Sequence, residues 1–280
     1  MDTRQAQKIA ESYLQKLELD RRSLLSAKNV GSRLCNKKYE EFWHLRFSDP
    51  EGSLRMELRE DLLLSLIRIG PNDRELVKHE PFLPEAMARK RIGELVQKLG
   101  WSAEYPDISD LSARHDEERP GWGADLPRVA QGVRFSSQGA WLRISGQGQV
   151  LRIERPNYTP APKSFVERIS AAQAVAIADA CIRRCSLQLS PTSLQEVTKN
   201  KRVVQPSAFW DEANWKGDKT RHISTDPSEE FSRVAWIVVY PVPYDESRLF
   251  YGAKHSIYSV YVDIETGAVI GGWHGPHLSP

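Results

Sequence analysis

Apolar residues recur with helical spacing in three segments of the chain. They fall at offsets of 0, 3, 4, 7, 8 and 11 between Ala6 and Leu17, and again between Ala174 and Cys185. Ala88 to Leu99 matches the same pattern in part. This spacing places apolar side chains on one stripe of a helix, which must face a core. The pattern therefore predicts three amphipathic helices, each starting near a residue suited to a helix N-terminus: Thr3, Pro84 and Ser170.

Strand-like sequence closed by a tight turn follows each predicted helix. The most regular hairpin joins Tyr258–Asp263 to Ala268–Ile270, and Gly267 is predicted to supply the positive φ of its turn. Similar hairpins are predicted within Trp141–Ile153 and Leu54–Leu64. Alternating apolar and polar residues in these segments are typical of half-buried strands. The chain is thus expected to alternate between a helix and an antiparallel meander.

The order of these elements predicts an α+β fold built from tandem units, each with one helix packed on an antiparallel sheet. We place the units at 1–80, 81–160 and 161–280. Segment 101–130 holds seven acidic and three basic residues together with several Pro and Gly, and is predicted to be a long acidic loop in the second unit. Segment 199–231 is predicted to be a polar insertion in the third.

Composition narrows the class of protein. The 280 residues include 39 Lys and Arg against 37 Asp and Glu, a net charge of +2 that speaks against a nucleic-acid partner. The longest apolar stretch, Val234–Tyr240, is far shorter than the ~20 residues of a membrane-spanning helix. Residues 1–20 show no export signal. We therefore expect a cytoplasmic protein, unless an export segment has been removed.

No familiar catalytic or cofactor motif occurs in the sequence, so we assign no catalytic, cofactor-binding or metal-binding residue. His274 and His277 are spaced to share an ion, but Pro276 between them favours an exposed tail. Cys181 and Cys185 lie on the apolar stripe of the third helix and are predicted to pack in the core. Asp263 is predicted to fix the turn that follows it rather than to act as a catalytic carboxylate.

The last unit resembles a PepSY-type domain. The resemblance rests on the Ser170–Ala174 helix start, the strand Val234–Tyr240, and the ending Tyr261-Val262-Asp263 with its Thr266-Gly267 turn. The tandem layout is similar to that of YcdB/YcdC-like repeated-domain proteins, and the scaffold to a cystatin-like one. This resemblance implies regulation or inhibition of peptidases and brings no catalytic residues with it.

Large aromatic side chains in polar segments are the candidate binding residues. Trp210 and Trp215 lie in segment 199–231, and the other three fall between Pro241 and Lys254: Tyr244, Phe250 and Tyr251. Aromatic residues on loops are favoured anchors of protein interfaces. The alternative is that the tryptophans fold back as a lid over the sheet.

These observations lead to three functional hypotheses. The first is a non-enzymatic protein-binding or regulatory module, with a peptidase among its candidate partners and the sheet surface and aromatic loops as its contacts. The second is a small-molecule or metal-dependent enzyme on a cystatin-like scaffold, which would need a pocket that gathers ionisable residues from several units. The third is a structural subunit of an envelope or assembly.

Overall fold

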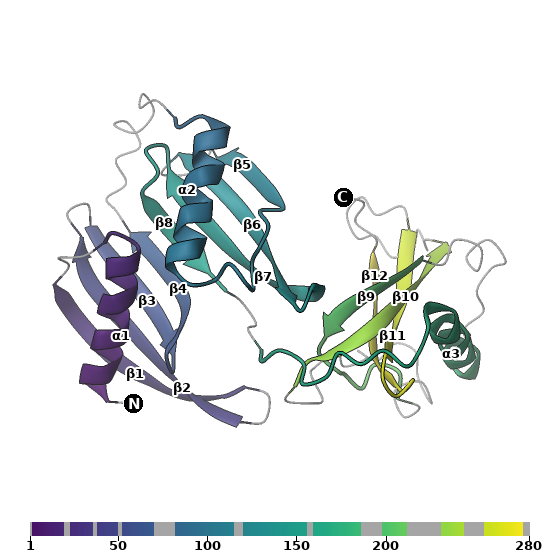
Figure 1. The fold of residues 1–280 in the computed structure, drawn as a ribbon. Coiled ribbons are helices and arrows are strands. Elements are labelled where there is room, and N and C mark those ends of the chain that lie inside the picture. Colours follow the sequence, from purple (N-terminus) through teal and green to yellow (C-terminus); the bar gives the residue numbers. More distant parts are fainter. Residues whose placement is uncertain are drawn as a thin grey trace. The chain divides into compact units, whose positions relative to one another are not determined.

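The computed structural model describes residues 2–19, 23–35, 38–49, 52–69, 82–114, 120–155, 159–185, 198–211, 231–243 and 255–276. These residues form two compact units. Unit 1 comprises Met1–Val129 and Ser137–Tyr158, and unit 2 comprises Ala130–Ser136 and Thr159–Pro280. The described strands are joined by hydrogen-bonded pairs into one twelve-stranded sheet. Figure 1 shows the elements of each unit.

Unit 1 contains two helices and the first eight strands. A tight turn joins the last two of these strands. In chain order its elements are α1 (Thr3–Lys16), β1 (Leu24–Cys35), β2 (Lys38–Asp49), β3 (Gly52–Arg59), β4 (Leu62–Ile69), α2 (Glu85–Lys98), β5 (Asp110–Arg114), β6 (Gly121–Ala130), β7 (Val133–Ser145) and β8 (Val150–Glu154). The first residues of β7 belong to unit 2.

Unit 2 contains one described helix and four strands of its own. These elements are α3 (Ala171–Arg184), β9 (Thr198–Val204), β10 (Arg233–Pro243), β11 (His255–Asp263) and β12 (Val269–Pro276). Strands β9 to β12 follow one another as antiparallel neighbours. The start of β7 pairs with β9 in parallel, through Phe135 and Val203.

The predicted fold class is wrong in one respect, because the helices and strands do not form independent tandem units. Strand β4 pairs with β8, through Ser65–Ile67 and Arg152–Glu154, and this pairing joins the strands that follow α1 to those that follow α2. Both helices also bury their apolar stripes in a single core cluster. The α+β content is as predicted, but one mixed sheet replaces the separate antiparallel sheets.

The acidic segment 101–130 is also not a loop throughout. Its residues include β5 and most of β6, which pair with each other through Asp110–Arg114 and Gly121–Asp125. Trp101 and Tyr105, at the start of the segment, are buried in the core of unit 1. The high content of Pro, Gly and acidic residues misled the prediction, because the buried aromatic and apolar positions between them determine where the segment packs.

All three predicted helices are present, and two of them begin with the same hydrogen-bonded cap. The Ser170 hydroxyl accepts the backbone N–H of Gln173, and the side-chain oxygen of Gln173 accepts the backbone N–H of Ser170. Asp2 and Gln5 form the same capping box at α1, so Asp2 caps this helix in place of the predicted Thr3. Pro84 occupies the N-cap position of α2.

Helices α2 and α3 are each held by the residue that precedes their N-cap. The Leu83 backbone donates to Gly146 O at 2.8 Å and accepts the indole N–H of Trp122 at 3.0 Å. Ile169 repeats both bonds, donating to Ile264 O at 2.9 Å and accepting from the Trp236 indole at 2.8 Å. We call this arrangement the helix anchor.

A glycine in the neighbouring hairpin completes each helix anchor. Gly148 has a φ of +84°, and a Cβ there would stand 3.0 Å from the Leu83 side chain. Gly267 has a φ of +74°, and a Cβ there would stand 3.2 Å from the Ile169 side chain. Glycine is favoured at both positions, because another residue would strain the left-handed backbone and crowd the anchor. The predicted role of Gly267 is confirmed.

The core of unit 2 lies between α3 and one face of its sheet. Ala174, Ala178, Cys181 and Ile182 of α3 pack with four buried side chains of β10 and β11: Val238, Tyr240, Val260 and Val262. The Tyr240 hydroxyl donates to Asp179 Oδ1 at 2.6 Å. Burial, together with this carboxylate, raises the pKa of Tyr240 above its ordinary value.

An ionic contact joins the end of α1 to α2. Glu18 follows α1 with a φ of +60°, at the place where Gly100 follows α2. Its carboxylate accepts a bond from Arg91 at 2.7 Å and another from Lys98. These two hydrogen bonds hold the pKa of Glu18 at about 2, below its ordinary value of 4.5.

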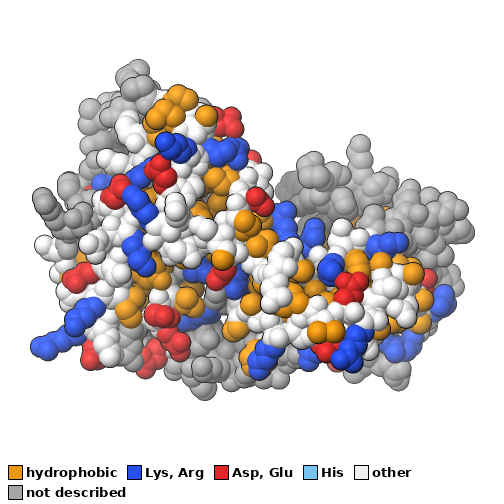
Figure 2. Space-filling model, in the orientation of Figure 1, with side chains coloured by type: hydrophobic (Ala, Val, Ile, Leu, Met, Phe, Trp, Pro, Cys, Tyr) orange, Lys and Arg blue, Asp and Glu red, His pale blue; other side chains and the backbone are white. Residues whose placement is uncertain are grey.

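Two further features of the molecule are the apolar length of the described helices and the distribution of charge on the surface. None of the described helices is long and apolar enough to cross a membrane. Figure 2 shows Lys and Arg side chains interspersed with Asp and Glu on the face drawn, as the near-balance of charge requires.

We expect Trp236→Phe to lower the free energy of unfolding by about 1–2 kcal/mol, because it leaves the half-buried Ile169 carbonyl without its indole donor. The control is Trp273→Phe, at a side chain that is 38% exposed. This control should change stability by less than about 0.5 kcal/mol. Urea unfolding followed by circular dichroism measures both, and equal effects would contradict the anchoring role of Trp236.

The Glu18 carboxylate should weaken the fold as it becomes protonated. Its pKa is depressed in the folded state, so its contribution is complete above pH 4.5 and is lost as the pH falls towards 2. The side chain is 52% exposed, which limits this contribution to about 1 kcal/mol or less. Urea unfolding of wild type and Glu18→Gln across this pH range checks the prediction. The stability difference between the two proteins should shrink below pH 4.5, and a constant difference would contradict it.

Candidate functional site

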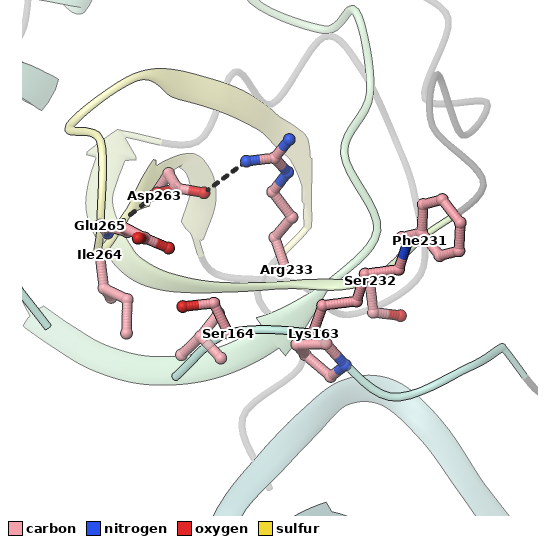
Figure 3. Close-up of a pocket in the computed structure, with 10 residues that line it drawn as sticks. Lys163, Ser164, Phe231, Ser232, Arg233, Asp263, Ile264 and Glu265 are labelled. Atoms are coloured by element: carbon pink, nitrogen blue, oxygen red, sulfur yellow. Dashed lines mark hydrogen bonds and ion pairs between the residues drawn. The ribbon is translucent and has the colours of Figure 1, made fainter. Parts of the chain in front are cut away.

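Unit 2 contains a cavity of about 300 Å³ beside the turn that joins β11 to β12. Three segments line it: Pro162–Ser164, Phe231–Val234 and Asp263–Glu265. Figure 3 shows that the labelled side chains of these segments surround one space. The linker that leads to α3, the start of β10 and the end of β11 thus meet here. A cavity of this size admits one or two side chains of a ligand, at the lower limit for a small-molecule site.

The floor of the cavity is apolar. Pro162 is buried, and Val234 and Ile264 are each 3% exposed. Val234 and Ile264 pack with Phe135 and Val203 in a small core cluster of their own. The backbone of Ile264 also receives the N–H of Ile169 in the helix anchor of α3. The cavity wall is therefore part of the packed structure of unit 2.

Asp263 holds the turn at the edge of the cavity. Its Oδ1 accepts the backbone N–H groups of Glu265 at 2.9 Å and Thr266 at 2.8 Å, and the Thr266 hydroxyl at 3.0 Å. Its Oδ2 accepts a bond from Arg233 at 3.3 Å. The prediction that Asp263 fixes the turn is confirmed, and its carboxylate is occupied by structural bonds.

Three charged side chains stand at the rim. Lys163 is exposed, and its ammonium lies 3.9 Å from the centre of the Phe231 ring. Arg233 is 42% exposed while its guanidinium contacts Asp263. Glu265 is 37% exposed and lies 3.9 Å from Arg168, a weak ion pair. Figure 3 shows Glu265 and Lys163 on different sides of the cavity.

A second candidate surface is the sheet face of unit 2 that α3 does not cover. Side chains alternate along a strand, so the neighbours of the buried α3-facing residues point to the other face. Ile237 lies across from Tyr261, and Val239 lies in line with Trp273 through Ser259. Three of these side chains are half-buried and Trp273 is 38% exposed. We call Ile237, Val239, Tyr261 and Trp273 the helix-free face.

The corresponding face of unit 1 has a different character. Opposite the side that packs on α1, β2 and β3 carry His44, Arg46, Arg55 and Glu57. His44 lies 3.8 Å from Glu57, and both arginines are exposed. A charged face of this kind is typical of a sheet that meets water. On β2 and β3 this face of unit 1 is charged, whereas the helix-free face of unit 2 carries apolar side chains.

Trp210 does not have the exposed position expected of an interface anchor. The side chain is 3% exposed, and its indole donates to Ser259 O at 3.0 Å. It packs edge-to-face on Phe209, and a Cβ at Gly272 would collide with its ring. This arrangement agrees with the alternative in which the tryptophan folds back over the sheet.

The other candidate binding residues lie outside the described residues: Trp215, Tyr244, Phe250 and Tyr251. His277 also lies outside them, whereas His274 is in β12 and stacks on Tyr258 with ring centres 4.2 Å apart. Within the described ranges, no three His, Cys, Asp or Glu side chains are placed to hold a metal ion.

The two cysteines of α3 have the structural role that was predicted. Both are buried, at 2% and 7% exposure for Cys181 and Cys185. Burial raises the pKa of the Cys181 thiol to about 11, with a smaller contribution from Cys185. The thiol therefore stays protonated near neutral pH, which makes it a poor nucleophile.

Sequence reasoning missed Lys163 and Phe231 at the cavity. It also did not single out the four residues of the helix-free face. Lys163 falls in a Pro-rich linker and Phe231 ends the polar insertion. Neither position carries a local signal of function. The sequence of β10 could have indicated a second apolar face, because Val234–Tyr240 is apolar at every position and does not alternate.

No family model matches the chain, and no curated protein matches it either. Among solved structures, an uncharacterized protein from Eubacterium rectale ATCC 33656 is similar with a TM-score of 0.51 and 9% identity, over 96% of this chain and 82% of that chain. The Bacillus megaterium YpeB C-terminal domain aligns over 99% of both chains with a TM-score of 0.45 and 11% identity. At this identity, the similarity to the E. rectale protein concerns the fold alone.

We expect Asp263→Ala to lower the free energy of unfolding by about 2–3 kcal/mol, since it removes three bonds that the charged carboxylate makes to the turn. Asp263→Asn keeps an oxygen acceptor and should cost less. Glu265→Ala is the matched control, with an expected change below about 0.5 kcal/mol. Thermal unfolding of the three variants checks this, and an Asp263→Ala protein as stable as wild type would disprove the structural role.

Proposed function

We propose that the chain is a non-enzymatic protein-binding module and that its helix-free face is the contact surface. The observation that carries this proposal is the set of four apolar side chains, contributed by three strands, on the face of unit 2 opposite α3. Trp273 is 38% exposed and the other three are half-buried, and apolar side chains gathered at a protein surface are a recognised mark of an interaction site. The corresponding positions of β2 and β3 in unit 1 are charged.

The composition of the helix-free face supports a protein partner. Trp273 and Tyr261 belong to the residue types that are enriched at the centres of protein interfaces. Ile237 lies beside Tyr261 on the adjacent strand, and Val239 lies in line with Trp273 with Ser259 between them, so a partner would meet apolar side chains from three strands. Such a surface suits a folded protein or an extended chain lying across the strands.

The chemistry of the cavity favours binding over catalysis. Asp263 is engaged in the turn and in the contact with Arg233, and Glu265 faces Arg168. A general acid or base must exchange a proton with a substrate, and a carboxylate that holds the backbone in place cannot do so without loss of the turn. The enzyme hypothesis and the structural-subunit hypothesis remain as alternatives.

The PepSY resemblance suggests the class of partner. It rests on the Ser170 cap, the apolar strand Val234–Tyr240 and the Asp263–Gly267 turn. All three are structural features of unit 2. If the resemblance extends to function, the partner is a peptidase and the chain inhibits or modulates it.

The test compares Trp273→Ala with Met87→Ala, which truncates another exposed apolar side chain (55% exposed, in α2). Wild type and both variants serve as bait in lysate and culture medium of the source organism, and each captured protein is then purified and its affinity measured. We expect Trp273→Ala to weaken a specific complex by about tenfold or more, with Met87→Ala unchanged. Equal affinities for all three baits would contradict the proposal.

A peptidase assay refines the result. If the purified partner is a peptidase, its activity in the presence of wild type should differ from its activity with the Trp273→Ala variant. A complex that leaves peptidase activity unchanged would limit the function to binding.

A further inference from the structure

We propose that the cavity of unit 2 binds an acidic side chain of an extended segment of the protein partner. The inference rests on the proposed protein-binding function and adds to it the chemistry that the partner must present. Three features of the cavity carry it: an exposed cation at the rim, a second cation held in place, and an apolar floor.

The first feature is the position of Lys163. Its ammonium faces the Phe231 ring at 3.9 Å, and no carboxylate among the described residues pairs with it. The side chain is exposed, so its charge is available to a ligand. A ring beneath the ammonium limits where the flexible lysine can lie, which lowers the entropy lost when a carboxylate binds.

The second feature is the guanidinium of Arg233. The buried Asp263 carboxylate holds it at 3.3 Å, and the same carboxylate is fixed by the turn. A cation that is positioned before the ligand arrives needs little reorganisation on binding. Lys163 and Arg233 line the same cavity, and Figure 3 shows Ser164 and Ser232 near them.

The third feature is the distribution of polarity within the cavity. Val234, Ile264 and Pro162 give the floor an apolar surface that suits the methylenes of a side chain. Glu265 stands away from Lys163, close to Arg168, and would repel a carboxylate from that side. A glutamate side chain combines the aliphatic stem and the terminal carboxylate that this arrangement fits.

The cavity is small. At about 300 Å³ it stands at the lower end of the range of ligand sites, a size that suits one or two side chains. The ligand must therefore be held by contacts beyond the cavity as well. Phe231, which lines the cavity and is 39% exposed, provides apolar surface for such contacts.

The experiment titrates the full chain with short peptides whose ends are blocked and whose central residue is Glu, Gln or Lys within the same alanine and leucine sequence. Binding is followed by the amide resonances of Ser164, Arg233 and Glu265. We expect the Glu peptide to bind about tenfold more tightly than the Gln peptide, and the Lys peptide to bind least. High salt should reduce the preference. Equal affinities for the Glu and Gln peptides would overturn the proposal.

Two variants locate the charge that is recognised. Lys163→Gln should weaken the Glu peptide by about tenfold and leave the Gln peptide unchanged, and Lys163→Glu should reverse the preference towards the Lys peptide. Lys8→Gln, an exposed lysine of α1, is the control and should change nothing. A Lys163→Gln protein that still prefers the Glu peptide would contradict the role of Lys163.

A further arm separates a side chain from a chain terminus. The Gln peptide with a free C-terminal carboxylate should bind no better than its blocked form, and tight binding of the free form would replace the proposed side chain by a terminus. The outcome is independent of the helix-free face. If Trp273→Ala abolishes a partner complex while the peptides show no preference for Glu, the protein-binding function stands and only the acidic ligand is disproved.

Discussion

The residue before each of the last two helices is the point on which the surrounding structure depends. Leu83 and Ile169 each donate a backbone hydrogen bond to a hairpin far along the chain, accept one from an indole of the sheet, and press their side chains against a glycine of that hairpin. A helix start leaves unpaired backbone groups, and fixing the preceding residue at three points sets where the helix begins and which stripe it turns to the sheet. The buried positions of α2 and α3 follow from this placement.

The two helix anchors have the same local contacts, but the hairpins that they contact pair with other strands and pack in the core in different ways. Around α2 the hairpin continues into β8, which pairs with β4 and shares a core with α1. Around α3 the hairpin ends in β12, and a separate core forms with β10 and β11. The same local contacts therefore occur at α2, which shares its core with α1, and at α3, which packs in a separate core. The anchor determines where the helix starts, and strand pairing determines how the elements are arranged around it.

This division explains what could be predicted from the sequence. Helices, hairpins, the cap at Ser170 and the turn at Asp263 depend on residues close together in the chain, and periodicity reveals them. The β4–β8 pairing depends on register between distant segments, which no local pattern records, and the predicted independent units failed for that reason. Likewise, Trp210 was a candidate binding residue because its neighbours in the sequence are polar. Its burial depends on the space that Gly272, a residue distant in the chain, leaves for its ring. Lys163 and Phe231 come together from distant segments, and their pairing had no signal in the sequence.

The cavity and the helix anchor of α3 share a residue, and this links binding to folding. Ile264 accepts the anchor bond from Ile169 with its carbonyl and lines the cavity between Asp263 and Glu265. The cavity exists only while the turn is formed, because Asp263 must hold that turn for Arg233 and the floor to be in place. A ligand that binds the formed cavity must therefore stabilise the turn, and through Ile264 the start of α3, by the free energy of its binding. The helix-free face lies on the same strands, β10 to β12. A partner that contacts both the cavity and the helix-free face would bind strands that are joined by the turn that Asp263 holds. A change in that turn would therefore weaken both contacts together.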